Sequence, residues 1–234
     1  MGLGKTLQTI TLLWTMLRQG PRGNPVCKRA LIVTPGSLVK NWEKEIKKWL
    51  GNERLQSFAV GTTKTVAQFA TISPKVNPVC IISYEMLLRQ FDDVKKVGFD
   101  LIITDESHRL KNASSKTALA IMGLAARRRV ALTGTPIQNN LKEFHAIVEF
   151  VNPGLFGTSQ AFARLYEGPV VAARQPGAPS DVKLLGDERL AQLNKMTALF
   201  CLRRTSETNN EFLPPKDEYV VMCPSLSGSF YYYR

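Results

Sequence analysis

The sequence lacks several features that would assign it to familiar classes of protein. Its four cysteines include no C-x-x-C pair, which argues against a zinc site and against a disulfide framework. No apolar run approaches the roughly 20 residues that a membrane-spanning helix needs. No internal repeat is present either. These absences predict a soluble protein of a reducing compartment, with no membrane among its partners.

Acidic residues are also few relative to basic ones. The chain has 31 Lys and Arg against 19 Asp and Glu, a formal net charge of +12. Residues 1–150 carry 22 basic against 11 acidic side chains, whereas residues 151–234 carry nine against eight. A basic surplus confined to one part of a chain favours a surface that binds a polyanion such as nucleic acid. A basic protein without such a surface is the alternative.

Short β-branched runs alternate with helical patterns in the first 150 residues. The runs are continuous rather than alternating, as in strands buried on both faces of a parallel sheet. They occupy residues 29–34, 56–60, 79–83, 99–104 and 129–134. Helical periodicity falls at residues 5–18, 37–50, 84–91, 114–125 and 139–150. This alternation predicts a doubly wound α/β fold with helices on both faces and ligands at the carboxyl ends of the strands.

Two local interpretations complete this lobe. In the helix at 37–50, Ser37 is the expected cap, and the apolar stripe consists of Leu38, Trp42, Ile46 and Trp49. The basic run at residues 127–129 is expected to be a solvated loop that precedes the last strand.

The pattern changes after residue 151. Residues 152–205 are predicted to form a mainly helical insertion, interrupted at 167–181 by a Pro/Gly/Ala-rich loop. Residues 206–234 are predicted to form a linker. The organisation expected is therefore a lobe at 1–151, an insertion at 152–205 and a linker at 206–234.

The first six residues, MGLGKT, have the character of a phosphate-binding loop. Gly2, Leu3 and Gly4 allow backbone N–H groups to converge on phosphate oxygens at the start of a helix. Lys5 is then placed to neutralise the β- and γ-phosphates, and the Thr6 hydroxyl to ligate Mg²⁺. An ordinary glycine turn that caps a helix is the alternative.

An acidic pair follows the apolar strand at 99–104. Two carboxylates at the end of a buried strand repel one another unless a cation lies beside them. A magnesium ion held by nucleotide phosphates meets that need. Asp105 is then expected to hold the metal, and Glu106 to orient and deprotonate the attacking water. Two solvated acids at a surface strand end are the alternative.

The third strand end of interest carries the turn Thr133, Gly134 and Thr135. Small hydroxyl residues at such a position suit detection of a γ-phosphate, although a plain turn is an equally natural interpretation. Because three strand ends carry matching groups in order, we expect one nucleotide site for ATP and Mg²⁺.

The ordered segments MGLGKTLQT, LIVTPGSLVKNW, IISYEML, DESHRLKN and LTGTPIQNN resemble the front-lobe motifs of Swi/Snf-type superfamily-two ATPases. Details such as RRVALTGTPIQN, LRRT and LPPK are similar to the recombination-repair, Rad-fifty-four branch, nearest its B paralogue. The resemblance implies a RecA-like lobe of a nuclear, ATP-driven translocase of double-stranded DNA. It also implies a strand-exchange recombinase as partner, in homologous recombination and double-strand break repair.

The resemblance further implies roles for individual residues. His108 is expected to couple the ATP site to the turn at 133–135. DNA phosphates are expected at motif turns where backbone N–H groups and basic side chains meet the duplex. The matching positions are Thr34, Pro35, Gly36, Ser37, Ser83, Tyr84, Arg109, Lys111 and Asn112.

By the same resemblance, the chain is expected to be a fragment. The leading half of the phosphate loop and a second RecA-like lobe with its arginine fingers are the missing parts. Two alternatives stay open. One is a strand-separating helicase of the same superfamily. The other is a catalytically inert module that binds DNA or a partner, which is the behaviour expected of the isolated chain without arginine fingers.

Overall fold

The computed structural model describes residues 3–20, 23–111, 115–134 and 141–204, together with Pro214, Tyr219 and Val221. Residues 2–201 form one compact unit, and Met1 with residues 202–234 forms another. All described residues of the second unit are exposed. Within the described part, no helix combines the length and apolar character needed to cross a membrane.

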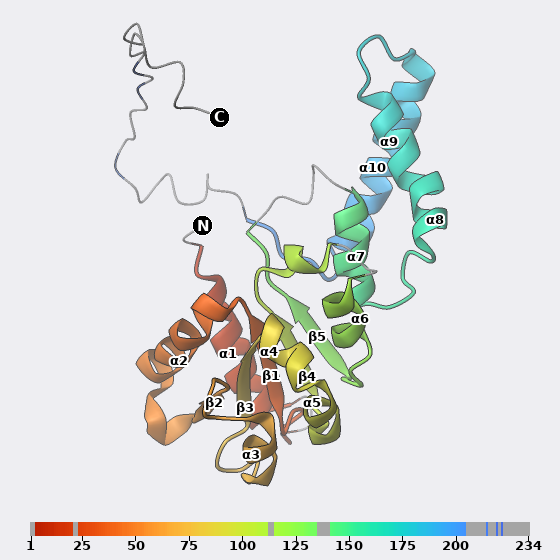
Figure 1. Ribbon diagram of the computed structural model, residues 1–234. Helices are drawn as coiled ribbons and strands as arrows, with labels where there is room; N and C mark the ends of the chain where they lie inside the picture. The colour runs from red at the N-terminus through yellow and green to blue at the C-terminus, as the bar shows by residue number, and fades with distance from the viewer. Residues whose placement is uncertain are drawn as a thin grey trace, which may run out of the picture. The chain divides into compact units, whose positions relative to one another are not determined.

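Within the described residues, five parallel strands form one sheet in the order β2-β3-β1-β4-β5 (Figure 1). The strands are β1 (Ala30–Thr34), β2 (Ser57–Ala59), β3 (Val79–Ser83), β4 (Leu101–Thr104) and β5 (Arg128–Ala131). All five coincide with the predicted apolar runs. The chain places β3 on one side of β1 and β4 on the other, so the strand order reverses at β1. Ligands bind beside such a reversal, at the carboxyl ends of the strands.

Helices cover both faces of this sheet, as predicted. The helices of the first lobe are α1 (Lys5–Arg18), α2 (Val39–Arg54), α3 (Val66–Thr71), α4 (Tyr84–Arg89), α5 (Phe91–Val97), α6 (Lys116–Met122) and α7 (Leu141–Val151). Short 3₁₀ turns, η1 (Gly36–Leu38) and η2 (Ser107–Leu110), follow β1 and β4. Helices α3 and α5 were not among the predicted segments.

Successive residues of the central strands enter two different cores. In β1, Leu31 and Val33 pack with helices α3 to α6, whereas Ala30 and Ile32 pack with α1 and α2. Every residue of β1 is buried. Both faces of the strand therefore need apolar side chains, which is why its sequence is continuous rather than alternating.

The start of α2 differs from the prediction. Ser37 lies inside η1, and no side chain caps α2, whose N-cap is Leu38. Trp42 and Ile46 are buried as expected, but Trp49 is 43% exposed. Val39 is buried in the same core as Trp42 and Ile46, and Leu38 packs against it half-buried.

The basic run at 127–129 is not a solvated loop. Arg128 and Arg129 belong to β5, and only Arg127 is exposed. The Arg129 guanidinium donates to the carbonyl oxygens of Phe150, Met122 and Leu124 at 3.0, 3.2 and 3.0 Å. It thus binds orphan carbonyls at the ends of two helices, and burial lowers its pKa.

The segment after residue 151 is helical, and it includes a helix where a loop was predicted. It contains α8 (Ser159–Phe162), the π-helical turn η4 (Ala163–Glu167), α9 (Gly168–Ala173) and α10 (Ser180–Thr197). Helix α9 lies within the predicted loop at 167–181, and its Val170 is buried with Leu193 of α10. This contact between helices, which local composition does not reveal, stabilises α9.

Helix α7 belongs to two cores at once. Its Phe150 packs in the core beside the sheet, whereas its Phe144 and Val148 pack with the helices after residue 151. The boundary predicted at residue 151 therefore falls at the end of a helix that both parts share, and the division into 1–151, 152–205 and 206–234 stays a prediction.

Candidate functional site

The carboxyl edge of the sheet collects the described residues that the sequence singled out. Thr34 ends β1 beside Ser83, which ends β3, and Asp105 follows β4 directly. The turn at Thr133 and Gly134 follows β5. In a parallel sheet these ends meet on one side, so residues up to 100 positions apart share one edge.

Gly4 and Lys5 begin α1 at this edge. Gly4 is the N-cap, with φ 71° and ψ 24°, a left-handed conformation that glycine adopts without a steric penalty. Lys5 Nζ lies 3.7 Å from the position that a Cβ on Gly134 would occupy. The Lys5 side chain therefore lies against the turn after β5. Leu3 and Thr6 flank it, both half-buried; Gly2 lies outside the described residues.

The acidic turn and the turn after β5 are also joined. The Ser107 N–H donates to the Leu132 carbonyl at 2.8 Å. The Ser107 hydroxyl is fully buried and donates to the Thr104 carbonyl at 2.9 Å. The predicted phosphate, acidic and Thr-Gly segments thus form one continuous neighbourhood. Thr135 lies outside the described residues.

The Asp105 carboxylate accepts hydrogen bonds from three donors. Oδ2 accepts from Trp42 Nε1 at 2.8 Å and from the Thr34 hydroxyl at 3.3 Å. Oδ1 accepts from the Glu106 N–H at 2.9 Å. An ionised carboxylate has about four lone-pair positions, so among the described residues one remains without a donor, on Oδ1. A hard cation such as Mg²⁺ fits that position.

Glu106 has a strained backbone. Its φ of 50° makes it the one described non-glycine residue with a positive φ. Such strain collects at functional sites, where the surrounding structure holds it in place. His108 Nδ1 lies 3.2 Å from Glu106 Oε2, but their orientation is not that of a hydrogen bond, which leaves Nδ1 unpaired among the described residues. The contact is therefore electrostatic at most.

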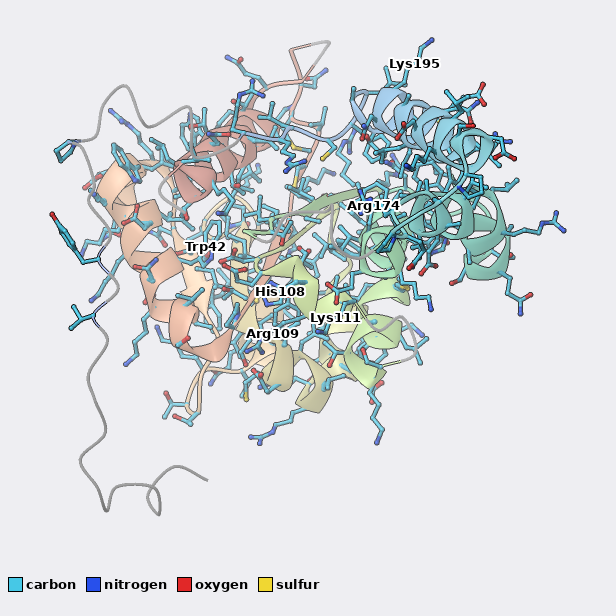
Figure 2. The ribbon with its side chains drawn as sticks, turned by 90° about the horizontal axis from the view of Figure 1, so that it is seen from above. Trp42, His108, Arg109, Lys111, Arg174 and Lys195 are labelled. Carbon is cyan, nitrogen blue, oxygen red and sulfur yellow. The ribbon has the colours of Figure 1, made fainter. Side chains whose placement is uncertain are left out.

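The residues predicted to meet DNA divide into a buried and an exposed group. The buried group contains Thr34, Pro35, Ser83 and Tyr84, and the exposed group contains Gly36, Ser37, Arg109 and Lys111. Asn112 lies outside the described residues. Figure 2 labels Arg109 and Lys111 close to His108. Only the exposed group presents itself to a ligand that approaches from solvent.

The buried group instead holds the site together. The Tyr84 hydroxyl donates to the Asp105 carbonyl at 2.7 Å, and the Ser83 hydroxyl caps α4 by accepting from Met86 N–H at 3.1 Å. Burial, with the Asp105 charge second, raises the pKa of the Tyr84 phenol well above its usual value. The phenol therefore stays protonated and remains a donor.

The exposed basic side chains are held by acids. Arg109 pairs with Glu85 at 3.0 Å and lies over the Tyr84 ring at 5.6 Å, and Lys111 pairs with Glu143 at 3.6 Å. The first pair is solvent-exposed and the second is exposed on its Lys111 side, with Glu143 half-buried, so both are worth little in stability and a polyanion can displace the acids at small cost.

Trp42 was expected only as a member of an apolar stripe. The structure shows its indole N–H on the Asp105 carboxylate. A buried tryptophan generally needs an acceptor for its indole N–H. A tryptophan on the buried stripe of a helix therefore indicates, from the sequence, that a polar partner lies nearby.

Comparison with known proteins gives a consistent result. The profile of the SNF2-related domain family matches residues 1–234. The chain is 54% identical, over its whole length, to DNA repair and recombination protein RAD54B of Gallus gallus, and 53% identical over 95% of its length to the Homo sapiens protein of that name. It spans about a quarter of the length of these relatives.

Solved structures show the same likeness. The chain is 29% identical to the Sulfolobus solfataricus SWI2/SNF2 ATPase core in complex with dsDNA, with a TM-score of 0.69. The match covers 88% of this chain and 39% of that chain.

Proposed function

Because the chain belongs to the SNF2-related domain family, we propose that it is the ATP-binding lobe of a DNA-dependent ATPase that translocates on double-stranded DNA. The observation that carries the proposal is the shared edge of the sheet. There the Lys5 ammonium lies against the Gly134 turn, and Leu132, just before that turn, accepts from the N–H of Ser107, just after Asp105 and Glu106. The site roles below rest on this arrangement.

Different residues at this edge have different roles in nucleotide hydrolysis. Backbone N–H groups of residues 2–6 and the Lys5 ammonium bind the phosphates, with the positive end of α1 behind them. Thr6 and Asp105 are the Mg²⁺ ligands, and the open position on Asp105 Oδ1 suits that role. Magnesium neutralises charge on the phosphates when it is bound.

Glu106 is the general base in this scheme. It orients the attacking water and takes its proton, and its positive φ sets the direction in which the side chain leaves the backbone. His108, next to Glu106, and the turn at 133–135 couple the state of the nucleotide to the neighbouring loops.

Double-stranded DNA is the proposed polyanion. Gly36 and Ser37 offer backbone N–H groups, and Arg109 and Lys111 offer exposed cations, on the edge that also carries the nucleotide site. Such contacts hold phosphates without reading bases, so binding should depend steeply on salt. The Sulfolobus relative in complex with dsDNA supports this choice.

The cellular role follows from the relatives. Several of them are named DNA repair and recombination proteins. We place this protein in homologous recombination and double-strand break repair in the nucleus, with a strand-exchange recombinase as its partner.

The proposal is tested by the ATPase rate of the intact protein, with and without duplex DNA. Duplex DNA should stimulate hydrolysis, and Glu106→Gln should lower the rate about 10²–10⁴-fold, the contribution of a general base. Lys5→Ala should abolish nucleotide binding. Lys75→Ala is the matched control, since Lys75 is exposed and precedes β3, at the opposite edge of the sheet.

Two results would count against the proposal. A rate that duplex DNA does not change would remove the DNA-dependent ATPase. Release of separated single strands in a displacement assay would instead favour a strand-separating helicase.

A further inference from the structure

The Asp105 carboxylate is fixed from a distant part of the chain. Trp42, on α2, is 63 residues away in sequence, yet its Nε1 lies 2.8 Å from Asp105 Oδ2. The Thr34 hydroxyl, at the end of β1, reaches the same oxygen at 3.3 Å. Oδ2 therefore has both of its lone-pair positions in use, and its donors come from the β1–α2 segment.

The bond to Trp42 is the stronger constraint of the two. Trp42 is 1% exposed and packs with Ile10, Ile32 and Ile46 in the core between the sheet and helices α1 and α2. Its ring cannot turn without disturbing that core. Both bonds reach a carboxylate and are therefore charge-assisted, but the Trp42 bond, at 2.8 Å against 3.3 Å, is the shorter of the two. The packed indole thus directs one carboxylate oxygen.

The same residue type in the same helix provides a contrast. Trp49 Nε1 also donates to a carboxylate, that of Glu45, at 2.8 Å. Trp49 is 43% exposed, however, and Glu45 is one helical turn away on the same surface. That bond is local and solvated. The two tryptophans therefore make chemically equal bonds in different settings, one inside the site and one outside it.

We propose that Trp42 is a positioning residue that orients the Asp105 carboxylate, so that the oxygen not bonded to the indole, here Oδ1, is presented to the metal of the nucleotide site. This inference rests on the proposed function, because Asp105 is a metal ligand only there. With the indole in place, any rotation that draws the bonded oxygen away from Trp42 Nε1 leaves a buried donor unpaired, whereas a half turn only exchanges the two equivalent oxygens. Partners of this kind tune metal affinity without touching the metal.

The first test compares two conservative variants of the intact protein, Trp42→Phe and Trp49→Phe. Each removes one indole N–H and keeps an aromatic ring. Trp42→Phe should raise the Mg²⁺ concentration for half-maximal ATPase about tenfold or more, with most of the rate recovered at saturating Mg²⁺. Trp49→Phe should leave it unchanged. Equal Mg²⁺ requirements in the two variants would overturn the proposal.

The second test needs no activity. The chain has three tryptophans, so ¹⁵N-labelled indole groups of the 234-residue chain give three N–H signals, which Trp42→Phe and Trp49→Phe assign. Asp105→Ala should move the Trp42 signal and leave that of Trp49 in place. If Asp105→Ala leaves the Trp42 signal unshifted, the hydrogen bond between Trp42 and Asp105 does not exist, and the proposal is wrong.

The two inferences fail separately. If the Trp42 signal responds to Asp105→Ala but duplex DNA does not stimulate hydrolysis, the proposed function fails and the bond stands. If duplex DNA stimulates hydrolysis and Trp42→Phe needs no more Mg²⁺ than the wild type, the positioning role fails and the function stands.

Discussion

Arg129 should be among the most important side chains for the stability of the lobe. Its guanidinium makes three hydrogen bonds to helix-terminal carbonyls and lies over the Phe150 ring at 5.5 Å. Hydrogen bonds to charged groups contribute about 1.5–3 kcal/mol each when buried. Because Arg129 is only half-buried and water can replace part of each bond, we expect Arg129→Ala to lower the free energy of unfolding by about 2–4 kcal/mol.

A second variant separates the contribution of the planar guanidinium, with its several donors, from that of its positive charge. Arg129→Lys keeps the charge near two helix C-termini but cannot reach three carbonyls in one plane. It should restore less than half of the loss. Urea denaturation followed by circular dichroism measures each value. The exposed neighbour Arg127 supplies the control, since Arg127→Ala should change the stability by less than about 0.5 kcal/mol. If Arg129→Ala costs no more than Arg127→Ala, the helix-terminal bonds are not stabilising.

Two further predictions concern packing and pH. Gly186→Ala should destabilise the protein by about 1–3 kcal/mol in thermal unfolding, because the new Cβ would lie 2.3 Å from Ala173 Cβ. The control is Gly61→Ala, whose new Cβ meets nothing within 4 Å and should leave the stability unchanged. Equal melting temperatures of the two variants would contradict the prediction. Burial raises the pKa of the Cys27 and Cys80 thiols from 9.0 to about 12. Above pH 9 the unfolded chain therefore releases protons that the native state keeps, and stability falls by about 1.4 kcal/mol per pH unit for each thiol. Cys80→Ala should reduce the loss of stability per pH unit by the contribution of one thiol. Urea titrations at pH 9–11 measure this slope of stability against pH, and the same slope in the variant and the wild type would refute the prediction.

The strands were predictable because their environment is uniform. A central strand such as β1 has apolar neighbours on both faces, so burial alone sets its composition. Helix α1 was predictable for a related reason, since one apolar face and a glycine at its start mark both its side and its beginning. Helix α9 was not, because its Gly- and Pro-containing sequence is stabilised by contact with α10.

The site was predictable to the level of segments. Asp105 and Gly134 follow strands, and the parallel topology brings strand ends together, so these two could be assigned to one edge; Lys5, at the start of α1, was assigned there by its glycine-rich turn. The division of the expected DNA contacts could not be predicted. Whether Tyr84 faces solvent or the Asp105 carbonyl depends on how α4 turns against the sheet.

The sequence by itself determined which residue types stand at the ends of which strands, because alternation of strands and helices follows from local periodicity. Only the tertiary structure decided which donor reaches which acceptor. Trp42 and Asp105, or Arg129 and Phe150, meet because separate helices pack on one sheet at fixed angles. Local periodicity describes each element alone and carries no information about those angles.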